Sequence, residues 1–121
     1  MLYKIIFESI DSTFDQIYKS DQYQRILNND NYIIQSFRQR KGTGRDSKKW
    51  VSPKGNIYIT LNQKCYSDDI LKNNFLICFL IHKFFHSKFS IMLQYKWPND
   101  LYFNNKKIIG VVSKSKIISQ I

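Results

Sequence analysis

Hydrophobic and polar positions along the chain follow two periodicities. Several short stretches alternate every second residue, or concentrate β-branched and aromatic side chains, which is typical of strands. One longer stretch, 70–88, is apolar on nearly every side, which is typical of a helix that is buried all round. We therefore predict a largely buried core helix at 70–88 and six strands, at 2–9, 32–38, 56–62, 91–96, 101–103 and 107–112.

A first helix is expected directly after the first strand, because Ser12 followed by Asp15 has the form of a capping box. A second helical piece at 22–27 would end at the asparagine-rich segment 28–31. The resulting order of elements, β-α-β-loop-β-α-β-β-β, predicts an α+β fold with a mixed, largely antiparallel sheet packed against helices.

Turns and one long loop separate these elements. The segment 39–49 is polar and basic and contains two glycines, so a loop is expected there, and a turn is expected at 52–55. The pair Asn104-Asn105 tolerates a left-handed backbone and predicts a hairpin. The strand at 56–62 would have two faces, one with Ile57, Ile59 and Leu61 and the other with Tyr58 and Thr60.

Length and charge narrow the class of protein. A chain of 121 residues fits one domain, and 43% hydrophobic with 16% aromatic residues argues against disorder. The net charge of +10 would attract phosphates, anionic lipids or acidic partners. An excess of lysine, isoleucine and asparagine also follows from AT-rich codons, however. A nucleic-acid-binding module would rest on charge alone, and we expect no specific nucleic-acid partner.

The cysteines and the apolar runs bear on location. Cys65 and Cys78 lack metal-like spacing, so no metal site is expected, and Cys78 sits in an apolar run typical of a core. A chain without a disulfide framework suits a reducing cytosol. The apolar run 75–81 is far shorter than the ~20 residues of a bilayer span, and the first residues do not form a signal peptide. We expect a cytoplasmic protein with no membrane partner.

Three segments carry candidate chemistry. The segment 96–101 puts a lysine, a tryptophan and a rigid proline turn at a strand end, which suits an anionic ligand; the alternative is a hairpin turn with an incidental lysine. In the loop 39–50, Gly42 and Gly44 let the backbone approach a ligand, and successive N–H groups can bind anionic oxygen. The alternative is a solvated basic loop, since the pattern is neither a P-loop nor a dinucleotide fingerprint. Hydroxyls in the segment 8–13 would bind a ligand or simply cap a helix.

Together these segments resemble, in order and spacing, the catalytic domain of biotin protein ligases. That family has Asp-Ser-Thr at its first helix, a Q-T-x-G-R-G-R-x-G-R-x-W loop followed by S-P-x-G-N-x-Y, and later K-W-P-N-D-L with a K-x-x-G hairpin. The resemblance covers essentially the whole chain, and the Lys-Trp-Pro-Asn-Asp-Leu string favours biotin ligases over the related lipoate ligases. The matching segments here are 11–13, 39–50, 52–58, 96–101 and 107–110.

The resemblance implies a reaction in two steps. Family members join biotin to ATP with Mg²⁺, giving biotinyl-5′-AMP and pyrophosphate, and then biotinylate a lysine of a biotin carboxyl-carrier domain of acetyl-CoA carboxylase or a related carboxylase. By position match, Lys96 would hold the biotin carboxylate and the adjacent phosphate, and Arg45 would be the catalytic residue of the loop. The other implied substrate-binding residues are Ser12, Thr13, Phe14 and Gln39 around biotin, Tyr58 and Thr60 beneath it, and Gly42, Thr43, Gly44 and Trp50 around the adenylate.

The loop departs from the family pattern at four positions. Arg40 stands where the family has threonine, Thr43 and Lys48 where it has arginine, and Ser47 where it has glycine. Because threonine cannot grip phosphate with a bidentate fork, weaker retention of the adenylate is expected.

The length also differs from the family pattern, which continues past the K-x-x-G hairpin. We expect a single, C-terminally short domain over 1–121, with no N-terminal helix-turn-helix and no C-terminal β-barrel. The alternatives are a weakly active or non-catalytic biotin- or adenylate-binding remnant and a lipoate-type ligase. An unpaired sheet edge would favour a homodimer.

Overall fold

The computed structural model describes residues 2–14, 21, 31–63 and 69–114. They belong to two units, Met1–Cys65 and Tyr66–Ile121. The expected helical segments after Phe14, with the capping partner Asp15, lie outside the described residues, as does Cys65. Those expectations, and that of a single domain, stay predictions.

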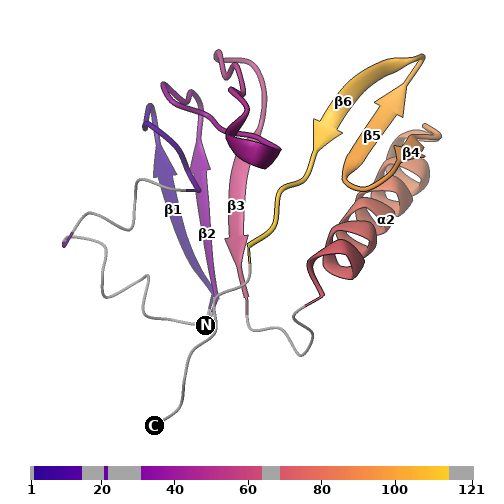
Figure 1. Cartoon of the computed structure of the whole chain (residues 1–121), viewed down its shortest axis with the longest axis horizontal. Coiled ribbons are helices and arrows are strands. Elements are labelled where there is room, and N and C mark those ends of the chain that lie inside the picture. Colours follow the sequence, from indigo (N-terminus) through magenta and orange to yellow (C-terminus); the bar gives the residue numbers. More distant parts are fainter. Residues whose placement is uncertain (1, 15–20, 22–30, 64–68, 115–121) are drawn as a thin grey trace, which may run out of the picture. The chain divides into compact units, whose positions relative to one another are not determined.

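Three strands form the sheet of the first unit: β1 (Tyr3–Phe7), β2 (Tyr32–Ser36) and β3 (Tyr58–Asn62). They lie side by side with β2 in the middle (Figure 1), parallel to β1 and antiparallel to β3. Tyr32 and Ile34 of the central strand are almost fully buried and form the centre of a small core. The side chains packed against that centre are Tyr3, Ile5, Phe7 and Ile10.

The two faces of β3 separate as predicted, and the buried face is the one that carries hydroxyl groups. Tyr58 and Thr60 are 7% and 8% exposed, whereas Ile59 and Leu61 are 52% and 51% exposed. Burial of the two hydroxyls is tolerated because each is hydrogen-bonded within the unit. The buried face of β3 is therefore polar.

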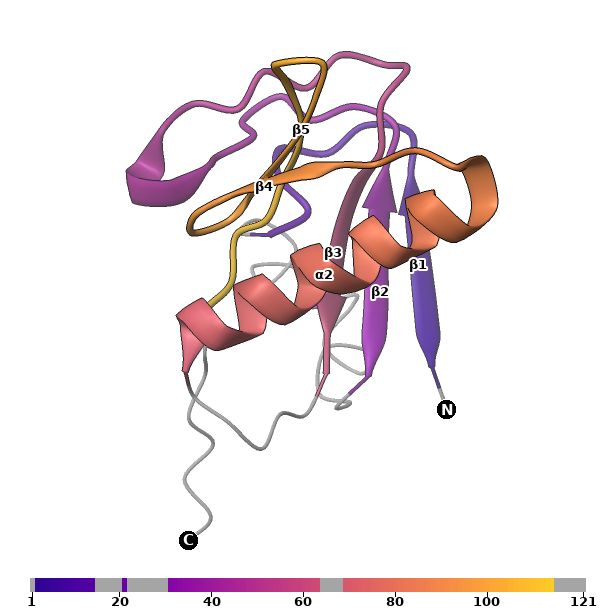
Figure 2. The same cartoon turned by 90° about the vertical axis from the view of Figure 1, so that its right-hand side faces the viewer.

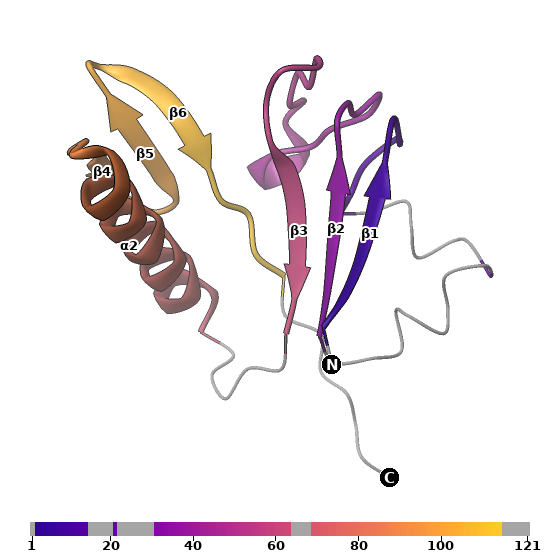
Figure 3. The ribbon, with the colours of Figure 1, turned by 180° about the vertical axis from the view of Figure 1, so that it is seen from behind.

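The second unit packs one helix on a small sheet. Figures 1 and 3 show α2 running beside β4 and β5. Cys78 of the helix is buried with Leu93 and Leu101 at the centre of this contact. The Oδ1 of Asp69 caps the helix by accepting from the N–H of Lys72 at 3.1 Å. The elements are α2 (Ile70–Phe89), β4 (Gln94–Lys96), β5 (Asp100–Phe103) and β6 (Lys106–Gly110).

The predicted position of α2 is confirmed, but the prediction that it is largely buried is wrong. Only Asn74 and Cys78 are buried on it, and Phe75, Leu76 and Leu80 are 49%, 52% and 55% exposed. Figure 2 shows α2 as one continuous helix with β4 beside it. An apolar sequence sets which side chains can be buried, whereas the number of surfaces that pack on the helix decides how many are.

The hairpin and the fold class are confirmed. Asn104 and Asn105 have positive φ angles of 49° and 60°, as a two-residue turn between β5 and β6 requires. Among the strand pairs of the described residues, only β1–β2 is parallel. The chain thus has an α+β fold with largely antiparallel pairing. Within the described part, no helix is both long enough and apolar enough to cross a bilayer.

Candidate functional site

A chain of polar side chains runs through the buried end of the first unit. Gln39 Oε1 accepts hydrogen bonds from the backbone N–H and the hydroxyl of Thr13, at 2.9 and 3.2 Å. Thr60 Oγ1 donates to Thr13 Oγ1 at 2.9 Å, and Gln39 Nε2 donates to Ser52 Oγ at 3.1 Å. Ser52 in turn donates to the backbone carbonyl of Trp50 at 2.9 Å. We call Thr13, Gln39, Ser52 and Thr60 the polar cluster.

Hydrogen bonds in the polar cluster run in one direction. The amide of Gln39 accepts on its oxygen from Thr13 and donates from its nitrogen to Ser52, which sets its orientation. Thr13, Ser52 and Thr60 are all less than 9% exposed, so a lost partner would leave a buried polar group unsatisfied, which is costly. Gln39 therefore organises this end of the unit in addition to its predicted role in binding a ligand.

Gln39 reaches the cluster because extended pairing continues past the end of β2. Its backbone N–H donates to the carbonyl of Ser52 at 3.1 Å, and the N–H of Arg40 donates to the carbonyl of Ile10 at 2.9 Å. Isolated β-bridges join Gln39 to Ile10 on one side and to Ser52 on the other. The segments 10–13, 39–42 and 50–52 therefore meet at the same end of the sheet.

Ser12 and Phe14 form a tight turn beside the polar cluster. Ser12 is 2% exposed, and its Oγ accepts from the backbone N–H of Phe14 at 3.1 Å. Such a bond is typical of a hydroxyl at the start of a helix or turn. It agrees with a capping role for Ser12, while the capping box itself stays a prediction.

Gly42 is packed so tightly against the polar cluster that no larger residue fits. A Cβ there would lie 2.5 Å from Ser52 Oγ, 2.5 Å from the carbonyl of Trp50 and 2.9 Å from Gln39 Nε2. At Gly44 a Cβ would meet only ordinary contacts, at 3.6 Å. The two loop glycines, which look alike in the sequence, therefore differ: only the first is required by packing.

The loop after Gly42 closes as a small hairpin. Thr43 pairs with Lys49, and the N–H of Gly44 donates to the carbonyl of Lys48 at 2.6 Å. Its tip is a 3-10 turn, η3 (Arg45–Ser47), which appears in Figure 1 as the short purple coil near the upper end of β3. The side chain of Arg45 is 57% exposed, and its Nε lies 3.8 Å from Asp46 Oδ2. Its guanidinium is thus accessible to an anionic ligand.

Ser47 stands where the family pattern has glycine, and its backbone adopts a conformation that favours glycine. Its φ angle is 59°, in the left-handed region, and that of Asp46 is 57°. Glycine adopts this region without the steric cost that other residues meet. A glycine in the family pattern at this position therefore matches the backbone that the chain adopts here with a serine.

Tyr58 belongs to a self-contained turn. Its hydroxyl donates to the carbonyl of Pro53 at 2.6 Å and accepts from Asn56 Nδ2 at 3.3 Å. Gly55 has a φ of 106°, which favours glycine. The S-P-x-G-N-x-Y motif therefore consists largely of residues that hold one another, and the Tyr58 hydroxyl is engaged in this turn.

Lys96 belongs to the second unit, where it is the last residue of β4 and pairs in register with Asp100. Its side chain is exposed, and Nζ lies 5.3 Å from the ring centroid of Tyr102. A cation over an aromatic face at this distance is attracted to it. The ammonium is thus held at the surface with an orientation, rather than buried in an ion pair.

Several residues that support Lys96 were missed by the sequence analysis. Asn99 is 6% exposed and bonds Val111 in both directions, through its side-chain Nδ2 at 2.8 Å and its backbone carbonyl at 2.9 Å. Lys107 Nζ lies 2.9 Å from Asp100 Oδ1. A signal was present in the strings K-W-P-N-D-L and K-x-x-G, since Asp100 of the first contacts Lys107 of the second across the hairpin.

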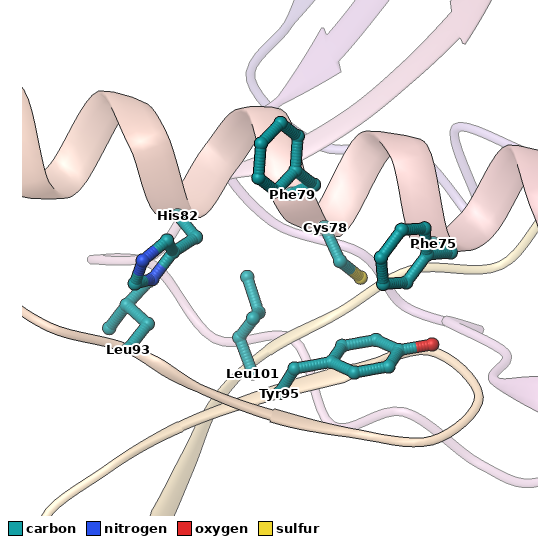
Figure 4. Close-up of a pocket in the computed structure, with 7 residues that line it drawn as sticks. All are labelled: Phe75, Cys78, Phe79, His82, Leu93, Tyr95 and Leu101. Atoms are coloured by element: carbon teal, nitrogen blue, oxygen red, sulfur yellow. The ribbon is translucent and has the colours of Figure 1, made fainter.

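An apolar pocket of about 150 Å³ lies between α2 and the strand segment that leads into β5 (Figure 4). Cys78 lies at its floor, and burial, with a smaller contribution from the charge of Asp100, raises the pKa of its thiol. The pKa of Tyr95 is raised as well, mainly by desolvation. The predicted core role of Cys78 is confirmed. The pocket is lined by Phe75, Cys78, Phe79, His82, Leu93, Tyr95 and Leu101.

The structure brings most of the predicted site residues together in the first unit. Thr13, Gln39 and Thr60 share one hydrogen-bonded chain, and Gly42 packs directly on it. Lys96 is described within the second unit. Among the described residues, no three His, Cys, Asp or Glu side chains gather as a metal site would require.

The chain matches the sequence model of a known protein family. The model of the biotin/lipoate A/B protein ligase family matches residues 6–121. The chain belongs to that family. The resemblance inferred from the sequence is thereby confirmed at the level of a biotin/lipoate ligase catalytic domain.

Solved structures of biotin ligases share the fold of this family member. A biotin protein ligase from Aquifex aeolicus in complex with biotin and ATP aligns with a TM-score of 0.78 and 25% identity, over 91% of this chain and 45% of its own. A Helicobacter pylori biotin acetyl coenzyme A carboxylase synthetase with bound biotinylated ATP aligns with 0.76 and 24%, over 96% and 56%. A Leishmania major biotin protein ligase with biotinyl-5-AMP aligns with 0.70 and 24%, over 94% and 52%.

The ligase-family chain described here spans about half the length of these solved proteins. No curated protein matches it. Family membership and shared fold therefore rest on the family model and on the solved structures.

Proposed function

We propose that the chain is an ATP-dependent biotin protein ligase, which forms biotinyl-5′-AMP from biotin and ATP and then biotinylates a lysine of a carboxyl-carrier protein. Membership of the family and the likeness to a ligase solved with biotin and ATP support this function. The observation that carries it is the polar cluster, with Gly42 closed tightly upon it.

The polar cluster, together with Ser12 beside it, suits the ureido ring of biotin, which is neutral and has one acceptor oxygen and two N–H donors. Hydroxyl oxygens of Ser12 and Thr13 can accept from those N–H groups, because a hydroxyl offers two lone pairs. The Gln39 amide carries a second N–H beyond the one given to Ser52. A site of neutral hydrogen-bonding groups favours a neutral polar ring over a charged one.

The loop and Lys96 suit the charged part of the reaction. Arg45 offers an exposed guanidinium that can grip phosphate oxygens with two parallel N–H bonds. Lys96 offers an ammonium on a rigid strand end. Thr43, Gly44 and Trp50 belong to the same small hairpin as Arg45 and would cover the nucleotide.

The two steps need positioning and charge stabilisation, with no enzyme nucleophile. In the first, a carboxylate oxygen of biotin attacks the α-phosphorus of ATP, and the bond to pyrophosphate breaks. The ammonium of Lys96 would stabilise the negative charge that builds on the phosphate oxygens. In the second, the amine of the acceptor lysine attacks the acyl carbon, AMP leaves, and the amine releases a proton. Preorganised cations in a closed site contribute most to such reactions.

The proposed reaction also requires a divalent cation and an acceptor protein. Mg²⁺ would neutralise phosphate charge and would arrive with ATP, since this ion commonly binds through substrate phosphates. The acceptor would be the biotin carboxyl-carrier domain of acetyl-CoA carboxylase or a related carboxylase. A cytoplasmic location would supply all of these.

The test is ATP-dependent biotin transfer by the full chain. Purified protein, biotin, Mg²⁺ and ATP should release pyrophosphate, and a biotin carboxyl-carrier domain added to the mixture should gain one biotinyl group by mass spectrometry. Folded protein that binds no biotin by calorimetry would refute the proposal. Binding without pyrophosphate release would leave only the non-catalytic remnant, and a preference for lipoate over biotin would identify a lipoate-type ligase.

A further inference from the structure

Arg40 makes a two-pronged contact with the segment that precedes the candidate biotin residues. Its Nε donates to Asp11 Oδ1 at 2.7 Å, and its Nη1 donates to Ser9 Oγ at 2.9 Å. The planar guanidinium makes both bonds from two separate nitrogens in a fixed geometry, which the single ammonium of a lysine or the hydroxyl of a threonine does not offer. The side chains of Arg40 and Asp11 are 51% and 27% exposed, so solvent weakens this ion pair without removing it.

Gln39 and Arg40 hold the same segment from opposite sides. Neighbouring residues of an extended backbone point to opposite faces. Gln39 reaches Thr13 on the buried side, and Arg40 reaches Asp11 on the more exposed side. Two backbone hydrogen bonds, of 2.9 and 2.7 Å, join the two segments between these side chains. The segment 9–13 is therefore fixed along both of its faces.

The contact also bears on which ligand Arg40 serves. An arginine in a loop that binds nucleotide would ordinarily be assigned to phosphate. Two of the five N–H donors of Arg40, however, are engaged by Asp11 and Ser9, which turns its guanidinium toward the segment 9–13. Threonine stands at this place in the family pattern, so the contact is a feature of this chain.

We propose that Arg40 is a positioning residue for biotin: through Asp11 it fixes Ser12 and Thr13 where they contact the ureido ring. This inference rests on the proposed function. It assigns Arg40 to the biotin side of the site, and it does not make Arg40 a phosphate ligand.

The experiment compares Arg40→Thr with Arg38→Thr in the full chain. Arg38 is exposed, and replacing it removes the same charge without breaking the ion pair between Arg40 and Asp11. Hydrogen exchange of the Thr13 backbone amide, followed by NMR, reports whether the segment is held, since this N–H donates to Gln39. Steady-state kinetics then gives KM for biotin, KM for ATP and kcat.

Arg40→Thr should speed exchange of the Thr13 amide and raise KM for biotin by about two- to five-fold, the size of effect expected for a partly exposed pair. KM for ATP and kcat should not change, and Arg38→Thr should leave all four measurements as they are. Arg40→Lys keeps the charge but loses the planar fork, so its Thr13 exchange rate and its KM for biotin should lie between those of the unmodified chain and those of Arg40→Thr. Once Asp11→Asn is present, Arg40→Thr should add little further change.

Two outcomes would overturn the inference. One is an Arg40→Thr variant whose exchange and KM for biotin match those of Arg38→Thr. The other is an effect on KM for ATP in place of KM for biotin. If the unmodified chain neither binds nor activates biotin, the proposed function fails instead. Unchanged exchange in those samples would still refute the contact, and faster exchange would still support it.

Discussion

Lys107 places its ammonium nitrogen 2.9 Å from Oδ1 of Asp100, and in this way joins the two strands of the hairpin that follows Lys96. The side chain of Asp100 is only 17% exposed, and Asp100 is also the residue that faces Lys96 across β4 and β5. The pair therefore links the K-x-x-G motif to the register of the strand that ends in Lys96.

Breaking this pair should destabilise the hairpin. Lys107→Met leaves the poorly exposed carboxylate of Asp100 without its ion pair, which should lower the free energy of unfolding by about 1–3 kcal/mol. Urea unfolding measures the loss, and Lys106→Met, at the exposed neighbouring lysine, is the matched control. Adding Asp100→Asn to Lys107→Met should restore part of the stability, because no unpaired charge then remains. An equal effect of both lysine variants would argue against the pair.

Lys96→Ala should slow adenylation severely while the fold persists. Lys96 is exposed, and its main described contact is with the ring of Tyr102, so its removal leaves no cavity. Loss of one preorganised charge at a reacting phosphate commonly costs about 10²–10³ in rate. Pyrophosphate release under saturating biotin and ATP measures this, with circular dichroism to verify folding. A Lys96→Ala variant with normal pyrophosphate release would remove Lys96 from the mechanism.

Alkaline pH should destabilise the second unit through Cys78. Its folded pKa is raised above the ordinary value of 9.0, mainly by burial, so the folded state holds the thiol proton that the unfolded state gives up. The stabilisation is therefore fully present below pH 9.0 and is lost as pH rises toward the folded pKa. Between pH 9.0 and 10.0, the free energy of unfolding measured with urea should fall less steeply with pH in Cys78→Ala than in the unmodified chain. Parallel declines in the two proteins would contradict the assignment.

Local signals predicted the elements of this fold better than its interior. The helix expected at 70–88 runs over Ile70–Phe89, because Asp69 caps one end and Ser90 adopts a left-handed backbone at the other. Both determinants lie within a few residues of the helix. The asparagine pair of the hairpin is local in the same sense. Burial of the helix was predicted wrongly, since it depends on partners that an apolar pattern does not specify.

The candidate site could be predicted by residue type but not by geometry. Thr13 is joined to Gln39, 26 residues away, and to Thr60, 47 residues away. No spacing rule relates three such positions. The contact between Arg40 and Asp11 spans 29 residues and arises at a departure from the family pattern, so the resemblance gave no hint of it.

Gly42→Ala should damage the polar cluster, whereas Gly44→Ala should not. A methyl group at Gly42 would lie 2.5 Å from Ser52 Oγ and from a backbone carbonyl, so the loop must shift. Overpacking of this kind typically costs about 1–3 kcal/mol of stability, and biotin affinity should fall with it because Gln39 is displaced. Thermal unfolding and biotin calorimetry on both variants give the comparison. A Gly42→Ala protein with unchanged biotin affinity would show that the loop accommodates the methyl group.

Ser47→Gly should stabilise the loop that carries Arg45. Ser47 has a φ of 59°, and a left-handed backbone costs a non-glycine residue roughly 1–2 kcal/mol. Glycine avoids that cost but loses about 0.5–1 kcal/mol in chain entropy, so the net gain should be at most about 1.5 kcal/mol. Lys48, with a φ of −65°, is the matched control: Lys48→Gly meets the entropy cost alone and should destabilise. Because η3 lies in the loop, hydrogen exchange of the Gly44 amide, which donates to the Lys48 carbonyl, measures both variants locally. Slower exchange in Ser47→Gly and faster exchange in Lys48→Gly are expected, and exchange that quickens in both would mean that the serine backbone is not strained.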